Sequence, residues 1–238
     1  MDAGNALTIA AVAFGATTQA VTGLGFSIVC VPALTVVYGG RDGVRLTNLL
    51  ALGVNVLVLG REGRHADFRR AFSLFVPAAI AAPLTAIAIH YADADLLSII
   101  AGVVVLATVG ALAVGARAPA LSGPLGAVLA GSASGAMNVV AGISAPTVAS
   151  YASNAQWPPD RLRPTLATYF LGLNAVSVAV RGAPDISSGL LIGCAVALVV
   201  GYAVGVVLRG RIDARHLQLG TLLFAGCGAV AAIIKGFT

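Results

Sequence analysis

Small polar side chains gather around glycines at two places in the chain. The first is the stretch Thr22–Ser27, and the second is the stretch Asn138–Ser144. Glycine lets a backbone approach a ligand closely, and the neighbouring hydroxyl and amide groups can donate hydrogen bonds. Together with free backbone N–H groups, such residues suit the binding of a small oxyanion without a buried cation.

Both stretches interrupt long apolar runs. Segment 5–38 as a single helix would be roughly 50 Å long, well over a hydrocarbon core of about 30 Å. Segment 121–152 is also too long for one span. Glycines and small polar residues inside such runs indicate discontinuous helices. The second half of each broken helix would begin near Gly25–Ser27 and Gly142–Ser144, with unpaired N–H groups and a positive dipole end.

The glycines have an alternative role, because small residues also permit tight helix crossings in membranes. Two breaks at comparable positions in the two halves favour a ligand site. The residues predicted to contact the anion at the breaks are Thr22, Gly23, Gly25, Ser27, Asn138, Gly142 and Ser144.

Polar residues on the flanking helices are predicted to complete the site. They are Thr47, Asn48 and Asn55 on segment 43–60, and Thr165, Tyr169 and Asn174 on segment 162–180. For each of them a hydrogen bond between helices is an equally good explanation.

Two arginines stand where these helices begin. Arg45 and Arg163 each follow an aspartate by three residues, at Asp42 and Asp160. This spacing fits a helix cap with a local ion pair. It also fits a guanidinium at each entrance of an anion pathway.

Residues for other chemistry are missing from the apolar segments. All nine acidic residues fall in tails, loops or helix ends, whereas a proton relay normally needs a carboxylate within a span. The sequence contains no metal-ligand spacing, no cofactor motif and no buried Ser-His-Asp set. We therefore predict no catalytic residue, no metal, no cofactor and no enzymatic activity.

The composition is that of a membrane protein. Apolar residues make up 58% of the 238 residues and charged residues only 10%, against about 25% charged in a soluble domain. The mean hydropathy is +0.96. The net charge of +5 is interpreted as a signal of orientation rather than of nucleic-acid binding. The predicted partners are a small anionic substrate and the lipid bilayer.

The chain divides into eight apolar segments and two similar halves. The segments are 5–38, 43–60, 71–91, 96–116, 121–152, 162–180, 186–208 and 214–234. We predict an all-α polytopic protein made of two repeats, 1–117 and 118–238, that form one transmembrane domain. Internal repeats of this kind are typical of transporters.

The basic residues indicate the orientation of the repeats. If segment 121–152 enters and leaves on one side, ten basic residues lie on one face and four on the other. The larger group is Arg61, Arg64, Arg69, Arg70, Arg117, Arg161, Arg163, Arg209, Arg211 and Arg215, and the smaller group is Arg41, Arg45, Arg181 and Lys235. We place the larger group in the cytoplasm. Each half is then a re-entrant hairpin followed by three spans, and the halves are inverted in the cell inner membrane.

The order of these motifs resembles the sulfite exporter TauE/SafE family. The resemblance rests on a glycine-containing break, an apolar run to Val31-Pro32 and a polar helix opening at Thr47-Asn48. The second half repeats the theme with Ala145-Pro146 and Thr165. The resemblance implies transport of sulfite, sulfonates or related small anions.

The glycine clusters here are shorter than is usual in that family. Phe26 and Ile143 narrow the predicted tips and make them more apolar, which makes a C2 sulfonate such as sulfoacetate comparable to sulfite as the expected substrate. The expected function is that of a secondary transporter, either an exporter or a uniporter. An anion-selective channel is the alternative, and a scaffold subunit without flux is a third possibility.

Overall fold

The computed structural model describes residues 3–91, 93–113, 123–211 and 214–236, and this part of the chain is helical and contains no strand. The helices are α1 (Ala3–Thr22), α2 (Phe26–Glu62), a short 3-10 helix (Gly63–His65), α3 (Phe68–Ala88), α4 (Ala94–Ala113), α5 (Gly123–Ala141), α6 (Ala145–Asn154), α7 (Pro159–Arg181), α8 (Ser188–Leu208) and α9 (Ala214–Gly236). The predicted all-helical class is therefore confirmed. The predicted repeat boundary at 117/118 and Arg117 lie outside the described residues.

Both predicted breaks separate helices in the structure. Helix α1 ends at Thr22 and α2 begins at Phe26, while α5 ends at Ala141 and α6 begins at Ala145. Gly23 has φ +84° and Gly142 has φ +64°. Side chains other than glycine rarely adopt this backbone conformation, so glycine at these two positions sets where the helices end.

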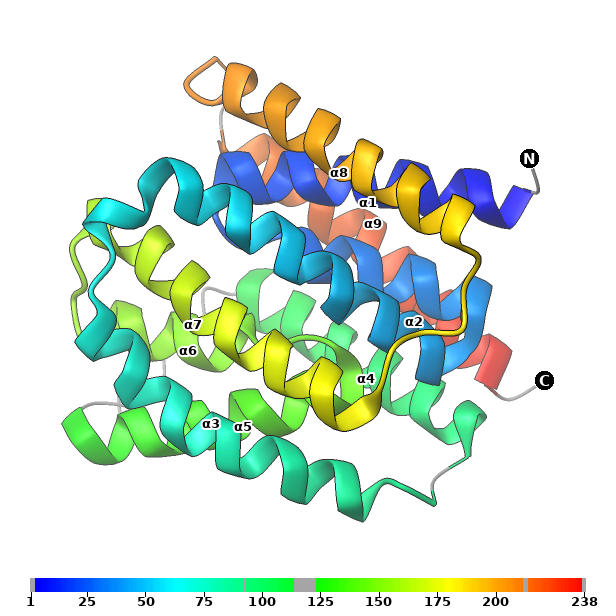
Figure 1. Cartoon of the computed structure of the whole chain (residues 1–238), viewed down its shortest axis with the longest axis horizontal. Helices are drawn as coiled ribbons and strands as arrows, with labels where there is room; N and C mark the ends of the chain where they lie inside the picture. Colours follow the sequence, from blue (N-terminus) through cyan, green and yellow to red (C-terminus); the bar gives the residue numbers. More distant parts are fainter. Residues whose placement is uncertain (1–2, 92, 114–122, 212–213, 237–238) are drawn as a thin grey trace.

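Helix α2 reverses its direction at Gly39, which has φ 78° and ψ 168°. The sequence predicted a loop between segments 5–38 and 43–60. The structure instead turns at this one glycine, because glycine alone tolerates such dihedral angles cheaply. We call residues 26–38 the first arm of α2 and residues 40–62 its second arm; they are the darker and lighter blue parts of α2 in Figure 1.

The two broken segments form two helical hairpins. Helix α1 and the first arm of α2 make one hairpin, and α5 and α6 make the other. In Figure 1, α1 runs leftward from the side where both chain ends are drawn, whereas α5 runs rightward from the opposite side. The two hairpin turns thus extend into the bundle from opposite ends.

Glycines with a spacing of four bring two pairs of helices into backbone contact. On α8, a Cβ atom at Gly201 would lie 2.2 Å from the carbonyl oxygen of Ala13, so α1 and α8 touch directly. On α5, a Cβ at Gly135 would lie 2.5 Å from the carbonyl oxygen of Ala78 on α3. Gly205 and Gly131 extend the same two contacts. These four glycines therefore permit tight helix crossings.

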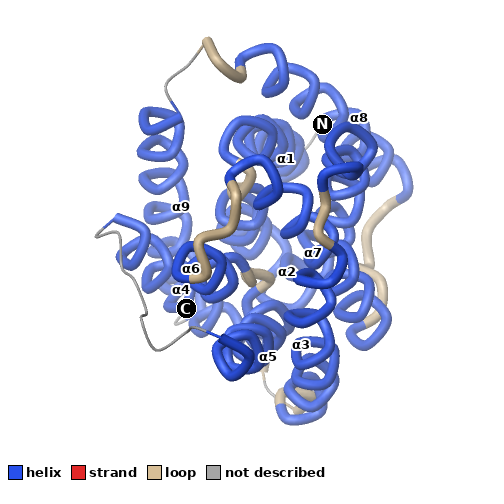
Figure 2. Tube along the Cα trace, turned by 90° about the vertical axis from the view of Figure 1, so that its left-hand side faces the viewer, coloured by secondary structure: helices blue, strands red, loops and turns tan. Residues whose placement is uncertain are grey.

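The pattern of exposure is inverted relative to a soluble protein. Large apolar side chains are exposed along α3, from Phe68 to Ile87, and along α8, from Ile192 to Val207. Asparagines such as Asn48 are buried. In Figure 2, which views the bundle from one end, α3 and α8 lie on its outside and the labels of α2 and α7 lie further in.

Four segments of the described chain are long and apolar enough to cross a membrane by length and composition: Phe26–His65, Phe68–Ala88, Gly123–Ala141 and Ser188–Leu208. Two shorter apolar helical stretches, Asp95–Ala107 and Gly220–Ala231, accompany them. Together with the apolar outer faces of α3 and α8, these lengths suit a lipid environment.

Candidate functional site

A cavity of about 30 Å³ lies where the two hairpin turns approach each other. Its walls come from both turns, from the second arm of α2 and from α7. The lining residues are Gln19, Leu24, Gly25, Phe26, Ser27, Ile28, Ala51, Val54, Asn55, Ile143, Ser144, Ala145, Phe170 and Asn174. We call it the tip cavity. Of the residues predicted from the sequence, it brings together Gly25, Ser27, Asn55, Ser144 and Asn174.

Most of the lining comes in pairs of positions 119 residues apart. The pairs are Leu24 and Ile143, Gly25 and Ser144, Phe26 and Ala145, Ala51 and Phe170, and Asn55 and Asn174. The same spacing relates Gly23 to Gly142, the two glycines with positive φ. The sequence predicts Gly25 and Gly142 as the corresponding glycines of the two turns. The backbone geometry instead pairs Gly23 with Gly142.

Gln19 holds the first turn together, although it is not among the residues predicted from the sequence. Its Oε1 accepts hydrogen bonds from the backbone N–H groups of Gly25 (2.9 Å) and Phe26 (3.2 Å), and its Nε2 donates to the carbonyl oxygen of Gly23 (2.9 Å). Two of the N–H groups expected to be free are therefore satisfied by this amide. The available signal was its position four residues before Gly23, which matches that of Asn138 before Gly142.

Asn138 organises the second turn. Its Nδ2 donates to Oγ of Ser144 (3.3 Å) and to Oδ1 of Asn174 (3.0 Å), while its Oδ1 accepts from the hydroxyl of Ser177. Asn174 thus accepts through its oxygen, which leaves its NH₂ group with two donor hydrogens for other partners. Because Asn174 also lines the tip cavity, this network prepares its amide as a donor for a ligand there.

Two asparagines of the second arm of α2 hold buried amide oxygens. Asn55 donates from Nδ2 to the carbonyl oxygen of Ala51 (2.8 Å), and Asn48 directs Nδ2 toward the carbonyl oxygen of Asn138 (3.5 Å). Among the described residues, neither Oδ1 has a hydrogen-bond partner. A buried amide oxygen without a partner lowers the stability of the folded protein. A water or a ligand hydroxyl in the tip cavity would offset this by donating a hydrogen bond to Oδ1 of Asn55.

The remaining predicted residues lie away from the tip cavity. Thr47 donates to the carbonyl oxygen of Gly43 (2.8 Å). Thr165 accepts from the backbone N–H of Asp67 (2.9 Å), just before α3 begins. Tyr169 is buried and lines a separate cavity between α3 and α7. Thr22 lines a neighbouring cavity of about 170 Å³.

Gly25 and Gly142 are required by packing. A Cβ at Gly25 would lie 2.4 Å from Cγ2 of Thr18, and a Cβ at Gly142 would lie 2.9 Å from Cγ2 of Val31. A larger side chain at either position would therefore disturb the hairpin itself. Substitutions of these glycines test folding, and ligand binding is better tested at the polar lining residues.

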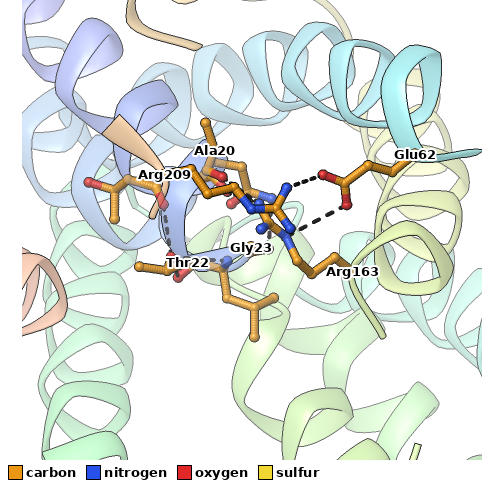
Figure 3. A network of polar contacts seen from close by, with 9 residues as sticks. Ala20, Thr22, Gly23, Glu62, Arg163 and Arg209 are labelled. Carbon is orange, nitrogen blue, oxygen red and sulfur yellow. Dashed lines mark hydrogen bonds and ion pairs between the residues drawn. The ribbon is translucent and has the colours of Figure 1, made fainter. Parts of the chain in front are cut away.

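Arg163 closes the α1 hairpin at one end of the bundle. Its guanidinium donates to the carbonyl oxygens of Gln19 and Ala20, the last turn of α1. Its Nε lies 3.9 Å from Oε2 of Glu62, which also pairs with Arg209. Figure 3 shows the two arginines converging on this one carboxylate beside Gly23. Arg163 is thus tied to protein groups, unlike a free cation at an entrance.

Arg45 lies at the other end of the second arm of α2. Its guanidinium is 3.1 Å from the carboxylate of Asp42, as the predicted local ion pair requires. It also lines a cavity of about 150 Å³ together with Arg41 and Arg181. The sequence grouped these three arginines on one face, and the structure brings them to one cavity.

The tip cavity is a small compartment with amide and hydroxyl donors, and no charged side chain of the described residues lines it. A sequence model of the family described as sulfite exporter TauE/SafE matches residues 7–232. Neither the comparison with curated proteins nor the comparison with solved structures returned a match. The family match covers nearly the whole chain and both hairpins that form the tip cavity, and the chain therefore belongs to the sulfite exporter TauE/SafE family.

Proposed function

We propose that the protein is a secondary transporter that carries a small sulfur-containing oxyanion, such as sulfite, sulfoacetate or another C2 sulfonate, across the cell inner membrane. The observation that carries this proposal is the tip cavity, which both hairpin turns build together. A ligand held there contacts both halves of the protein at once. Movement of one half relative to the other would then expose the ligand to one side or the other.

The polar groups at the tip cavity suit an anion. Helix α2 begins at Phe26, and the backbone N–H groups of Ser27 and Ile28 have no acceptor among the described residues. These N–H groups and the helix dipole attract negative charge. The amide of Asn174 and the hydroxyls of Ser27 and Ser144 add neutral donors, and no carboxylate of the described residues lines the cavity to repel an anion.

The tip cavity is small. At about 30 Å³ it has room for about two water molecules. The neighbouring 170 Å³ cavity shares Leu24, Ile28 and Ala145 with it. Displacement of these three side chains would join the two spaces, which would make room for a sulfonate with a short carbon tail.

We further propose that the two halves are inverted repeats of one re-entrant hairpin and three spans. The hairpins extend from opposite ends (Figure 1), and α1 packs on α8 as α5 packs on α3. At one end Arg163 and Arg209 meet Glu62, and at the other Arg41, Arg45 and Arg181 line one cavity. This separation supports the ten-to-four division of basic residues and a cytoplasmic location for the Glu62 end.

Thiol labelling tests this topology. In a background without Cys30, Cys194 and Cys227, a cysteine at Gln156 should react only with reagent supplied from the cytoplasmic side. A cysteine at Ser187 should react only from the outside, because the two positions flank α7 at opposite ends. Labelling of both from the same side would contradict the inverted arrangement.

A carrier and an anion channel are distinguished by their flux. Because a carrier must rearrange for each ion that it moves, uptake of radiolabelled sulfite into proteoliposomes should saturate with concentration. Unlabelled sulfite on the far side should accelerate the uptake by counterflow. A linear flux without counterflow would identify a pore, and no flux for sulfite, sulfoacetate or isethionate would contradict the proposed function altogether.

A further inference from the structure

Three arginines converge on one cavity at the end of the bundle opposite Glu62. Arg41 and Arg45 come from the start of the second arm of α2, and Arg181 is the last residue of α7. They line a cavity of about 150 Å³ together with His90 and four apolar residues. We call it the arginine cavity.

The lining of the arginine cavity is positively charged. In the described chain its lining contains three guanidinium groups and no carboxylate. Asp42 pairs with Arg45 from outside the lining, and Arg181 donates to the carbonyl oxygen of Val139. The Nε of Arg45 is buried without a hydrogen-bond partner. Guanidinium groups that line one cavity repel one another, and a bound oxyanion would offset that repulsion.

Polar side chains lie on two helices between the arginine cavity and the tip cavity. On the second arm of α2, Asn48 and Asn55 follow Arg45, and Asn55 lines the tip cavity. On α7, Ser177 and Asn174 precede Arg181 and join the Asn138 network. Ten residues of helix separate Arg45 from Asn55, about 15 Å along the axis. The arginine cavity thus lies at the end of α2 and α7 from which these polar side chains follow toward the tip cavity.

We propose that the arginine cavity is a second anion-binding site, which takes one small oxyanion through the guanidinium groups of Arg41, Arg45 and Arg181. Guanidinium forks match the oxygen spacing of sulfur and phosphorus oxyanions. The identification of this anion with the transported one rests on the proposed function. The binding of an oxyanion at the arginines rests on the cavity alone.

The stoichiometry of binding tests the second site. Isothermal titration of the purified full chain with sulfite in detergent should give two ions per chain. The variant Arg41→Gln/Arg45→Gln should lose one of them or bind it at least tenfold more weakly. Arg45→Lys keeps the charge without the fork and should give an intermediate result. Arg64→Gln, an exposed arginine of the 3-10 helix, is the matched control and should bind two ions.

The same titration separates this inference from the proposed function. If sulfite binding is lost in Asn174→Ala but unchanged in the folded arginine variants, the second site is refuted and the tip cavity stands. If one ion binds and only the arginine variants lose it, the second site stands and the tip cavity is refuted.

Repeating the titration in nanodiscs with and without phosphatidylglycerol distinguishes a free anion from a lipid phosphate. Competition by the anionic lipid identifies the headgroup as an occupant of the same oxyanion site.

Discussion

Replacing Gln19 by glutamate is expected to abolish anion transport while leaving the protein folded. A carboxylate at this position keeps an acceptor for the N–H groups of Gly25 and Phe26, which the amide oxygen now binds. The donation to Gly23 is lost, and a carboxylate oxygen then faces the carbonyl oxygen of Gly23 in a buried site, which costs about 3 kcal/mol. The new negative charge lines the tip cavity, and at about 4 Å from a bound anion it repels by about 4 kcal/mol at an effective dielectric constant of 20.

That repulsion corresponds to roughly a thousandfold weaker binding. The measurement is sulfite binding and flux of Gln19→Glu, with circular dichroism and thermal unfolding as the test of folding. Gln156→Glu makes the same chemical change in an exposed turn and should transport normally. Transport by Gln19→Glu at the rate of the unmodified protein would exclude an anion from the tip cavity.

Replacing Glu62 by glutamine should destabilise the protein more than the loss of any exposed ion pair. The side chains of Glu62 and Arg163 are only 17% and 14% exposed. Removing the acid leaves a largely buried guanidinium without its counter-charge, which typically costs about 3 kcal/mol or more. Because Arg163 also holds the last carbonyl groups of α1, the α1 hairpin should loosen with it (Figure 3).

The control for Glu62→Gln is Asp42→Asn. This change removes the carboxylate that pairs with Arg45. The side chains of Asp42 and Arg45 are 33% and 26% exposed, which is more than those of Glu62 and Arg163. Exposed pairs of this kind contribute about 1 kcal/mol or less. Thermal unfolding in detergent measures both variants. Equal losses of stability would mean that the Glu62 network is no more than a surface ion pair.

The helix breaks could be predicted from the sequence because their causes are local. Glycines inside apolar runs break a helix wherever they must take positive φ, as Gly23 and Gly142 do. The turn at Gly39 was harder to predict, because Gly39, Gly40 and the charged residues Arg41 and Asp42 together have the composition of an ordinary loop. Its single-residue reversal depends on packing around the second arm of α2.

The partners of polar side chains could not be predicted from the sequence. Thr165 and Asn174 look alike as polar residues on one helix, yet Thr165 accepts from Asp67 whereas Asn174 joins Asn138. Gln19 was overlooked because its three hydrogen bonds depend on how the chain turns after Thr22. Side-chain type limits which bonds a residue can form, and the tertiary fold decides which of them it does form.

We predict that the membrane potential alone drives transport. No titratable residue lines the tip cavity in the described chain, so the site offers no group to carry a coupled proton. One negative charge moving outward gains about 2.3 kcal/mol per 100 mV, and a dianion gains roughly twice as much. These energies correspond to gradients on the order of 50-fold and 2,000-fold.

The most direct test measures sulfite flux in proteoliposomes under a potassium–valinomycin potential, with equal pH and equal sodium on both sides. We expect the anion to move toward the positive side, and we expect the flux to reverse when the potential is reversed and to increase with the size of the potential. The variant Gln19→Glu, assayed in parallel, should show no flux. Flux that ignores the potential, or that requires an imposed proton or sodium gradient, would contradict an uncoupled anion carrier.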